Sequence, residues 1–172
     1  MDEIVNKINE RLLKETPYNL ISNSSDNEKT IFHEAGHIVI AYYESLDLEY
    51  TSASPTNLSG NILGYTIVKF PTDSNKIRCY IKQAFAGVIT QRLYFEELTI
   101  YEIEGDYESL KENLEKNHVL SDYSPSEFYE IFEETLCDIK QNNIYKIAIK
   151  LIAYKLMIKP YLTYKEIKAI LN

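Results

Sequence analysis

One stretch of the sequence, residues 31–41, constrains the fold more than any other. It reads Ile-Phe-His-Glu-Ala-Gly-His-Ile-Val-Ile-Ala. Its apolar residues cover nearly every side of a helix, which predicts a central, buried helix. Three polar residues, His33, Glu34 and His37, interrupt this apolar surface. Because burying a polar group without a partner costs free energy, something inside the protein must satisfy each of the three.

The spacing His-Glu-x-x-His fits a zinc site. Residues four apart lie on one face of a helix with Cβ atoms roughly 5–6 Å apart, so His33 and His37 can reach the same Zn²⁺. Glu34 would lie beside the metal, where it could take a proton from a water molecule that zinc activates. The alternative is a chance match, with both histidines bonded to the backbone of the core. The pattern favours zinc because it fixes three polar residues inside an apolar helix.

Length and charge limit the classes of partner. The chain has 172 residues, of which 45% are hydrophobic, and we expect one zinc peptidase-like domain over residues 1–172, with an N-terminal helix and loop at 1–24. The formal net charge is −8. Acidity of this size argues against binding to a nucleic-acid backbone and against an anionic membrane surface. We therefore expect no nucleic acid and no membrane among the partners.

The cysteines and the N-terminal residues indicate a cytoplasmic protein. Cys79 and Cys137 form no Cys-x-x-Cys pair, and each lies in an apolar periodic segment, so buried free thiols are expected. The first residues show no basic segment followed by an apolar run, so no secretory signal is expected. No stretch approaches the ~20 apolar residues that a membrane-spanning helix needs.

Periodicity and capping signals predict a mainly α protein with a small β-sheet, in the α+β class. Helices are expected at 3–15, from the capping box at 25–28 to about 46, and at 74–97. Strands are expected at 48–56 and 61–70 with a turn at 57–61, and they must pack on helices or join a larger sheet. Further helices are expected from 106 to about 118, from 124 to about 158 with a break near 141–143, and from 163 to the end.

The third zinc ligand is harder to identify from spacing. Catalytic zinc sites usually have three protein ligands and one open position. Glu44 lies three turns along the same helix, which is too far. His118 is available, although a histidine at a helix end is commonly a surface residue. Asp106 follows Gly105 at the expected start of a helix, where a carboxylate is favoured and an ordinary N-cap would suffice as its role. Spacing alone leaves both residues open.

Five segments in order along the chain carry a resemblance to a known family. They are the His-Glu-Ala-Gly-His helix at 33–37, Gly-Tyr-Thr at 64–66, the small-residue helix from Ala-Gly at 86–87 through 93, Gly-Asp-Tyr-Glu-Ser-Leu at 105–110, and Leu-Thr-Tyr-Lys-Glu-Ile at 162–167. From about residue 28 the chain thus resembles the peptidase domain of the FtsH family of AAA+ zinc proteases. The resemblance implies a zincin-like fold around the central helix, one Zn²⁺ per chain, Asp106 as the third ligand and Glu34 as the catalytic base.

The chain departs from that family in several respects. It contains no Gly-x-x-x-x-Gly-Lys-Ser/Thr motif of an ATPase module, and Gln91 stands where the family carries a glutamate that supports the zinc site. We therefore expect a stand-alone zinc metalloendopeptidase that hydrolyses flexible or unfolded protein segments without ATP. Its partners would be a peptide or protein substrate, a separate ATPase or adaptor, and other copies of the chain.

A different class of function fits the same sequence. In a non-catalytic, zinc-stabilised protein-interaction module, the histidines would bind a zinc ion that only stabilises the fold. Gln91 and the missing ATPase motif both favour this alternative. Such a site has no use for Glu34, so the complete motif favours the enzyme.

Overall fold

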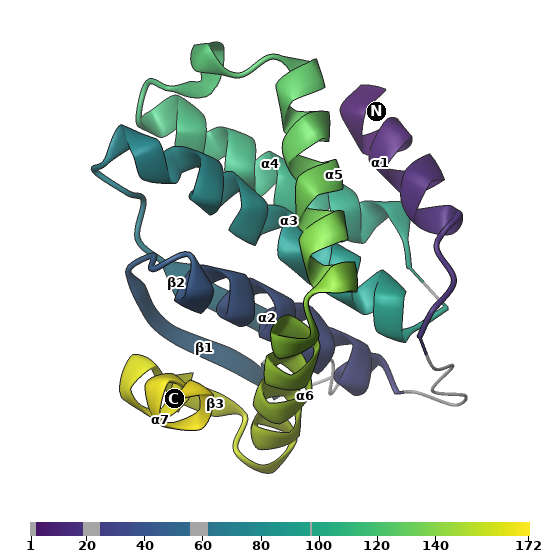
Figure 1. Cartoon of the computed structure of the whole chain (residues 1–172), viewed down its shortest axis with the longest axis vertical. Helices are drawn as coiled ribbons and strands as arrows, with labels where there is room; N and C mark the ends of the chain where they lie inside the picture. Colours follow the sequence, from purple (N-terminus) through teal and green to yellow (C-terminus); the bar gives the residue numbers. More distant parts are fainter. Residues whose placement is uncertain (1–2, 19–24, 56–61, 97) are drawn as a thin grey trace.

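The computed structural model describes residues 3–18, 25–55, 62–96 and 98–172. The described chain is mainly helical with one small antiparallel sheet, which confirms the α+β class (Figure 1). The longer elements, in chain order, are α1 Glu3–Leu13, α2 Asp26–Tyr43, β1 Leu48–Pro55, β2 Ile62–Val68, α3 Ile77–Tyr94, α4 Ile100–Lys116, α5 Pro125–Gln141, α6 Asn143–Ile158, β3 Tyr161–Thr163 and α7 Tyr164–Leu171. Two short 3₁₀ helices, η1 Ser74–Lys76 and η2 Leu120–Asp122, precede α3 and α5.

The helix α2 lies at the centre of the molecule. Its start is the predicted capping box, in which the Ser25 side chain accepts from the Glu28 backbone N–H and the Glu28 carboxylate accepts from the Ser25 N–H. The helix packs against α3, α6 and the strands β1 and β2. Residues 31–41 are buried apart from His33, which is partly exposed. The apolar surface of this stretch therefore contacts neighbours on several sides, as its sequence predicts.

Close approach of α2 and α3 depends on a glycine. A Cβ atom on Gly36 would lie 2.5 Å from the Ala86 carbonyl oxygen and 2.4 Å from Thr90 Oγ1. No side chain fits in that space, so the two backbones can come together only because residue 36 is glycine. This contact holds the histidine-bearing helix against α3, which supplies the groups behind the histidines.

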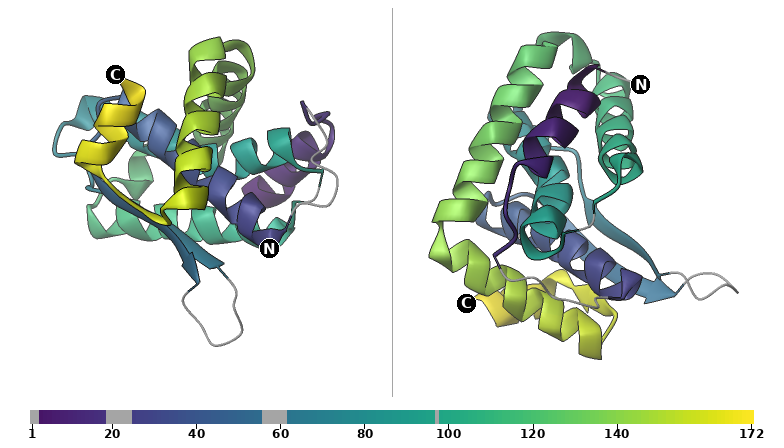
Figure 2. Two further views of the ribbon diagram at one scale, coloured as in Figure 1. Left: turned by 90° about the horizontal axis from the view of Figure 1, so that it is seen from below. Right: turned by 90° about the vertical axis from the view of Figure 1, so that its right-hand side faces the viewer.

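The sheet lies at one end of the molecule and α1, α4 and α5 at the other, with α2 and α3 between them (Figures 1 and 2). Strand order is β2-β1-β3 with antiparallel pairing, and Thr51 of β1 faces Thr66 of β2. The two predicted strands are confirmed with shorter ends, while the turn predicted at 57–61 lies outside the described residues. β3, which was not predicted, is only three residues long and follows Pro160. β2 pairs with β1 alone among the described strands, so it is an edge strand.

The predicted start of α4 is wrong. The helix begins at Ile100, and Asp106 lies inside it instead of serving as its N-cap. The Glu102 carboxylate accepts from the Thr99 backbone N–H at 2.7 Å and from the Thr99 hydroxyl at 2.9 Å, which fixes the helix start nearly two turns before Asp106. The Thr-x-x-Glu spacing was visible in the sequence, but Gly105 suggested a later start. Gly105 is simply a helical residue whose surroundings are open.

Other boundaries follow the sequence more closely. The predicted break near 141–143 is confirmed, because Asn142 ends α5 and its side chain accepts from the Ile144 N–H at 2.9 Å to cap α6. His118 follows the end of α4 in a left-handed conformation, φ 59°. The expectation of two buried thiols is wrong for Cys137, which is exposed because its side of α5 faces solvent. Cys79 is partly buried.

In the described part of the chain, every helix is too short or too polar to cross a membrane. This agrees with the prediction from the sequence.

Candidate metal centre

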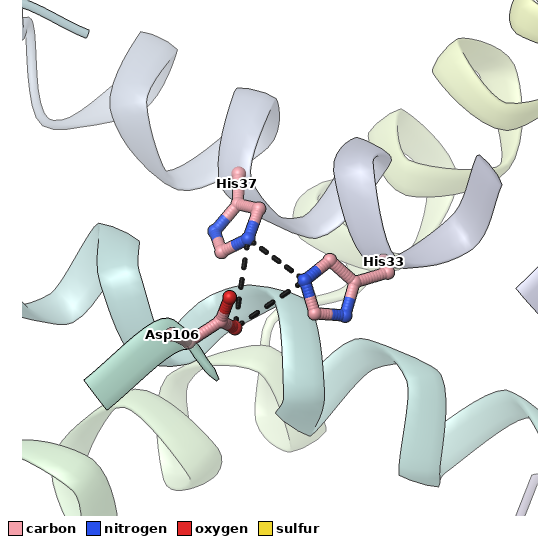
Figure 3. A group of neighbouring side chains, drawn as sticks. All are labelled: His33, His37 and Asp106. Atoms are coloured by element: carbon pink, nitrogen blue, oxygen red, sulfur yellow. Dashed lines mark hydrogen bonds and ion pairs between the residues drawn. The ribbon is translucent and has the colours of Figure 1, made fainter. Parts of the chain in front are cut away.

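Three side chains from two helices converge on one point (Figure 3). His33 and His37 come from successive turns of α2, and Asp106 reaches them from α4. The two Nε2 atoms are 3.0 Å apart, and Asp106 Oδ2 lies 3.3 Å from His33 Nε2 and 3.7 Å from His37 Nε2. A tetrahedral ligand set about 2.0–2.1 Å from zinc has corners roughly 3.3 Å apart. The three measured separations bracket that value, so the side chains fit a zinc ion without rearrangement.

When both histidines are neutral, the atoms that face one another at this point are hydrogen-bond acceptors. His37 Nδ1 lies 2.7 Å from the Gln83 carbonyl oxygen. A carbonyl only accepts, so Nδ1 carries the proton and the lone pair of Nε2 points at the other ligands. Asp106 Oδ2 is buried and has no hydrogen-bond partner among the residues that the structure describes. A buried, unpartnered carboxylate oxygen facing an imidazole lone pair is costly unless a cation lies between them.

Charge at the site favours a cation. Burial lowers the pKa of His33, but the Asp106 carboxylate beside it outweighs burial and raises that pKa to about 9. Burial likewise raises the pKa of Asp106, and the two histidines overcome that effect and hold it below its ordinary value. Both shifts express the same preference for positive charge between these side chains, which a divalent metal would satisfy.

Two further side-chain hydrogen bonds support His33 at Nδ1, the ring nitrogen that faces away from the candidate metal position. His33 Nδ1 is 3.1 Å from Gln91 Oε1, and the Gln91 amide nitrogen donates to Glu102 Oε1 at 2.7 Å. Gln91 therefore occupies the supporting place that the resemblance assigned to it. The contact with Glu102 was not predicted, because that residue was expected to lie between two helices, before a helix start at 106.

Glu34 is held by the edge strand. It is 4% exposed, and Thr66 of β2 donates to its Oε2 at 2.6 Å. Burial is the main reason that the pKa of Glu34 is raised. A Cβ atom on Gly64 would lie 2.4 Å from Glu34 Oε1, so only glycine leaves room for this carboxylate. Gly64 and Thr66 had been noted only for their resemblance, and their contacts give both a physical role.

The four residues open onto one cleft of about 410 Å³. Its walls are β2 over 64–68, the α3 residues Tyr80, Gln83 and Ala84, and the α4 residues Ser109, Leu110 and Asn113. His33, Glu34, His37 and Asp106 all line it. A ligand in the cleft would thus contact the candidate metal ligands and Glu34 together.

Gly87 makes room for the ion. A Cβ atom there would lie 2.4 Å from His37 Nε2 and 2.6 Å from His33 Nε2, the two atoms expected to bind metal.

We expect Gly87→Ala to abolish stoichiometric zinc binding in equilibrium dialysis while the helical circular dichroism persists. Gly105→Ala is the matched control, because its Cβ would meet nothing within 4 Å. This control should keep zinc and gain up to about 1 kcal/mol of stability from helix propensity. Full zinc binding by Gly87→Ala would show that the ion lies elsewhere.

The structure separates the two candidates for the third ligand. Among the described residues, one group of histidine, cysteine, aspartate and glutamate side chains is placed to hold a metal ion: His33, His37 and Asp106. His118 lies beyond the end of α4 and is not part of this group.

Paired substitutions test that assignment. Asp106→Asn keeps the size of the side chain but loses the charge, and should weaken zinc binding by at least the 10–100-fold typical of lost supporting contacts. His118→Ala should leave zinc affinity unchanged. Competition with a fluorescent chelator measures both, and the opposite ranking would make His118 the ligand.

No protein-family model matches the chain, and a search of curated proteins finds no match either. Any function must therefore be argued from the geometry of the site together with the motifs in the sequence.

Proposed function

We propose that the chain is a zinc-dependent metalloendopeptidase that hydrolyses flexible or unfolded protein segments without ATP, with a zincin-like fold of the FtsH peptidase type. The observation that carries the proposal is the convergence of His33, His37 and Asp106 beside a buried Glu34 on the wall of one cleft. A purely structural zinc site is closed by four protein ligands. Here three ligands face a cleft, which leaves room for a reacting molecule.

Zinc bound to the three ligands would act as a Lewis acid, lowering the pKa of a water molecule to about 7 and polarising the substrate carbonyl. Glu34 is the group that accepts the proton of the attacking water and then delivers it to the leaving amine. Thr66 occupies Oε2 of Glu34, which orients the carboxylate and leaves Oε1 for the transfer. Burial raises the pKa of Glu34 above its ordinary value, which suits a group that both takes and gives a proton.

The edge strand offers a way to hold substrate. β2 has one free edge among the described strands and forms a wall of the cleft over 64–68. An extended peptide can add to such an edge through main-chain hydrogen bonds. Folded substrates do not present an extended segment, so cleavage should be restricted to flexible ones.

A non-catalytic, zinc-stabilised interaction module is the second candidate, and one observation favours it. The outward side of α6 is apolar and exposed at positions spaced three and four apart: Ile144, Ile147, Leu151, Tyr154 and Ile158. The opposite side of α6 is buried in the core. A helix that is apolar on both sides is typical of a protein–protein contact. This surface is also compatible with an enzyme that works with an adaptor, an ATPase or other copies of itself.

The proposal is tested with zinc-loaded chain and casein, an unstructured substrate. We expect fragments to accumulate with time, to stop on addition of 1,10-phenanthroline, and to resume when zinc is restored. A stably folded protein should remain intact under the same conditions. If the zinc-loaded chain cleaves neither casein nor unstructured peptides, the interaction module becomes the better account.

A further inference from the structure

A side-chain relay runs from the start of α4 to the back of His33. Glu102 Oε1 accepts from Gln91 Nε2 at 2.7 Å, and Gln91 Oε1 lies 3.1 Å from His33 Nδ1. Glu102 and Asp106 are four residues apart on α4, so they share one face of that helix. The helix α4 therefore acts on both ring nitrogens of His33. Asp106 lies directly beside Nε2, and Glu102 reaches Nδ1 through Gln91 of α3.

The direction of each hydrogen bond in the relay follows from the groups involved. An ionised carboxylate can only accept, so the NH₂ group of Gln91 must face Glu102. The amide oxygen of Gln91 is then the atom that faces His33, and it can only accept as well. His33 must therefore carry its proton on Nδ1, which leaves the lone pair of Nε2 directed at His37 and Asp106. His37 reaches the same tautomer by a simpler route, through the Gln83 carbonyl.

The orientation of Glu102 is fixed in turn. Its second oxygen, Oε2, accepts from the Thr99 backbone N–H at 2.7 Å and from the Thr99 hydroxyl at 2.9 Å. A backbone N–H can only donate, so this position requires an acceptor. The helix cap thus determines which oxygen of Glu102 is presented to Gln91.

We propose that Glu102 is a positioning residue which, through Gln91, fixes the His33 tautomer that binds metal. The inference rests on the zinc site of the proposed function and identifies a residue that tunes it. The relay also explains how Gln91 can support His33 without a charge of its own, because Glu102, on the far side of Gln91, carries the negative charge. Loss of such an outer partner typically weakens metal affinity by about 10–100-fold.

Glu102→Gln is the informative variant because it keeps the size of the side chain, removes its charge and replaces one acceptor oxygen with a donor NH₂ group. The Thr99 N–H would hold the new amide oxygen, so the new NH₂ group would face Gln91. Gln91 would have to turn its oxygen toward residue 102 and its NH₂ group toward His33. His33 would then move its proton to Nε2, the atom needed for metal. We expect zinc affinity, measured by chelator competition, to fall by about 10–100-fold.

Exchanging the two side chains should restore the relay. In Gln91→Glu with Glu102→Gln, the amide at 102 donates to the carboxylate at 91, which again accepts from His33 Nδ1. We expect the double variant to bind zinc at least as tightly as the wild type. A role of Glu102 in fold stability alone predicts no such rescue. Thr99→Ala is the control for helix capping: it should lower the melting temperature but preserve zinc affinity, since the backbone N–H still holds Glu102.

The tautomer can also be read without metal. In ¹⁵N NMR spectra of the metal-free chain, recorded at a pH high enough for the His33 ring to be neutral, wild type and double variant should carry the proton on Nδ1, and Glu102→Gln on Nε2. Wild-type zinc affinity and an Nδ1 proton in Glu102→Gln would overturn the inference, as would a double variant that binds no better than the single one. A wild type that binds no zinc would refute the proposed function, whereas the NMR comparison would still decide the relay.

Discussion

Casein cleavage by Glu34→Gln should be about 10²–10⁴-fold slower than cleavage by the wild type, the contribution expected of a general acid–base residue. Glutamine keeps the size of the side chain and its oxygen can still accept from Thr66, so the buried position stays satisfied. Its amide cannot take a proton from water. Zinc content and melting temperature should therefore remain close to those of the wild type.

Glu44→Gln provides the matched control for this loss of charge. Glu44 is the residue that follows α2, at the end of the same helix, and it does not line the cleft. Its substitution should leave the cleavage rate unchanged. Equal, zinc-dependent cleavage by wild type and Glu34→Gln would refute the assignment of Glu34 as the base, and the water would need another proton acceptor.

His37→Ala should lose zinc almost completely. Removal of one of three ligands should cost more than the roughly 10–100-fold that an outer partner costs, because the remaining two are fewer than the three protein ligands that a catalytic zinc site needs. His33→Ala should behave in the same way. Added zinc should raise the melting temperature of the wild type, since ligand at 100 times its Kd stabilises the folded state by about 2.7 kcal/mol. It should leave both variants unaffected.

His118→Ala is the control for these losses, because His118 lies outside the metal group. It should keep both the bound zinc and the shift in melting temperature. Stoichiometric zinc in a chain that lacks both His33 and His37 would exclude the proposed centre altogether.

The sequence was most informative where chemistry and local structure coincide. The spacing of His33, Glu34 and His37 predicted both the helix and the side chains on its face, because residues four apart in a helix always meet. Capping boxes located the starts of α2, α5 and α7 for the same reason, since both partners lie within one turn.

Contacts between distant segments were not accessible from the sequence. Glu34 and Thr66 are 32 positions apart, and His33 and Gln91 are 58 apart. Such pairs meet only after the sheet and α3 have packed on α2. Asp106 was suggested by resemblance, and its predicted place at the start of a helix was wrong because the Thr99–Glu102 pair starts the helix earlier. β3 was missed because three residues carry too little periodicity to signal a strand.

The central claim is that His33, His37 and Asp106 hold one zinc ion. Metal analysis by mass spectrometry of chain purified without added metal tests it most directly. We expect about one zinc per chain, removed by a strong chelator and regained on addition of equimolar zinc. A purified chain that contains no zinc, and takes up none when equimolar zinc is added, would contradict it.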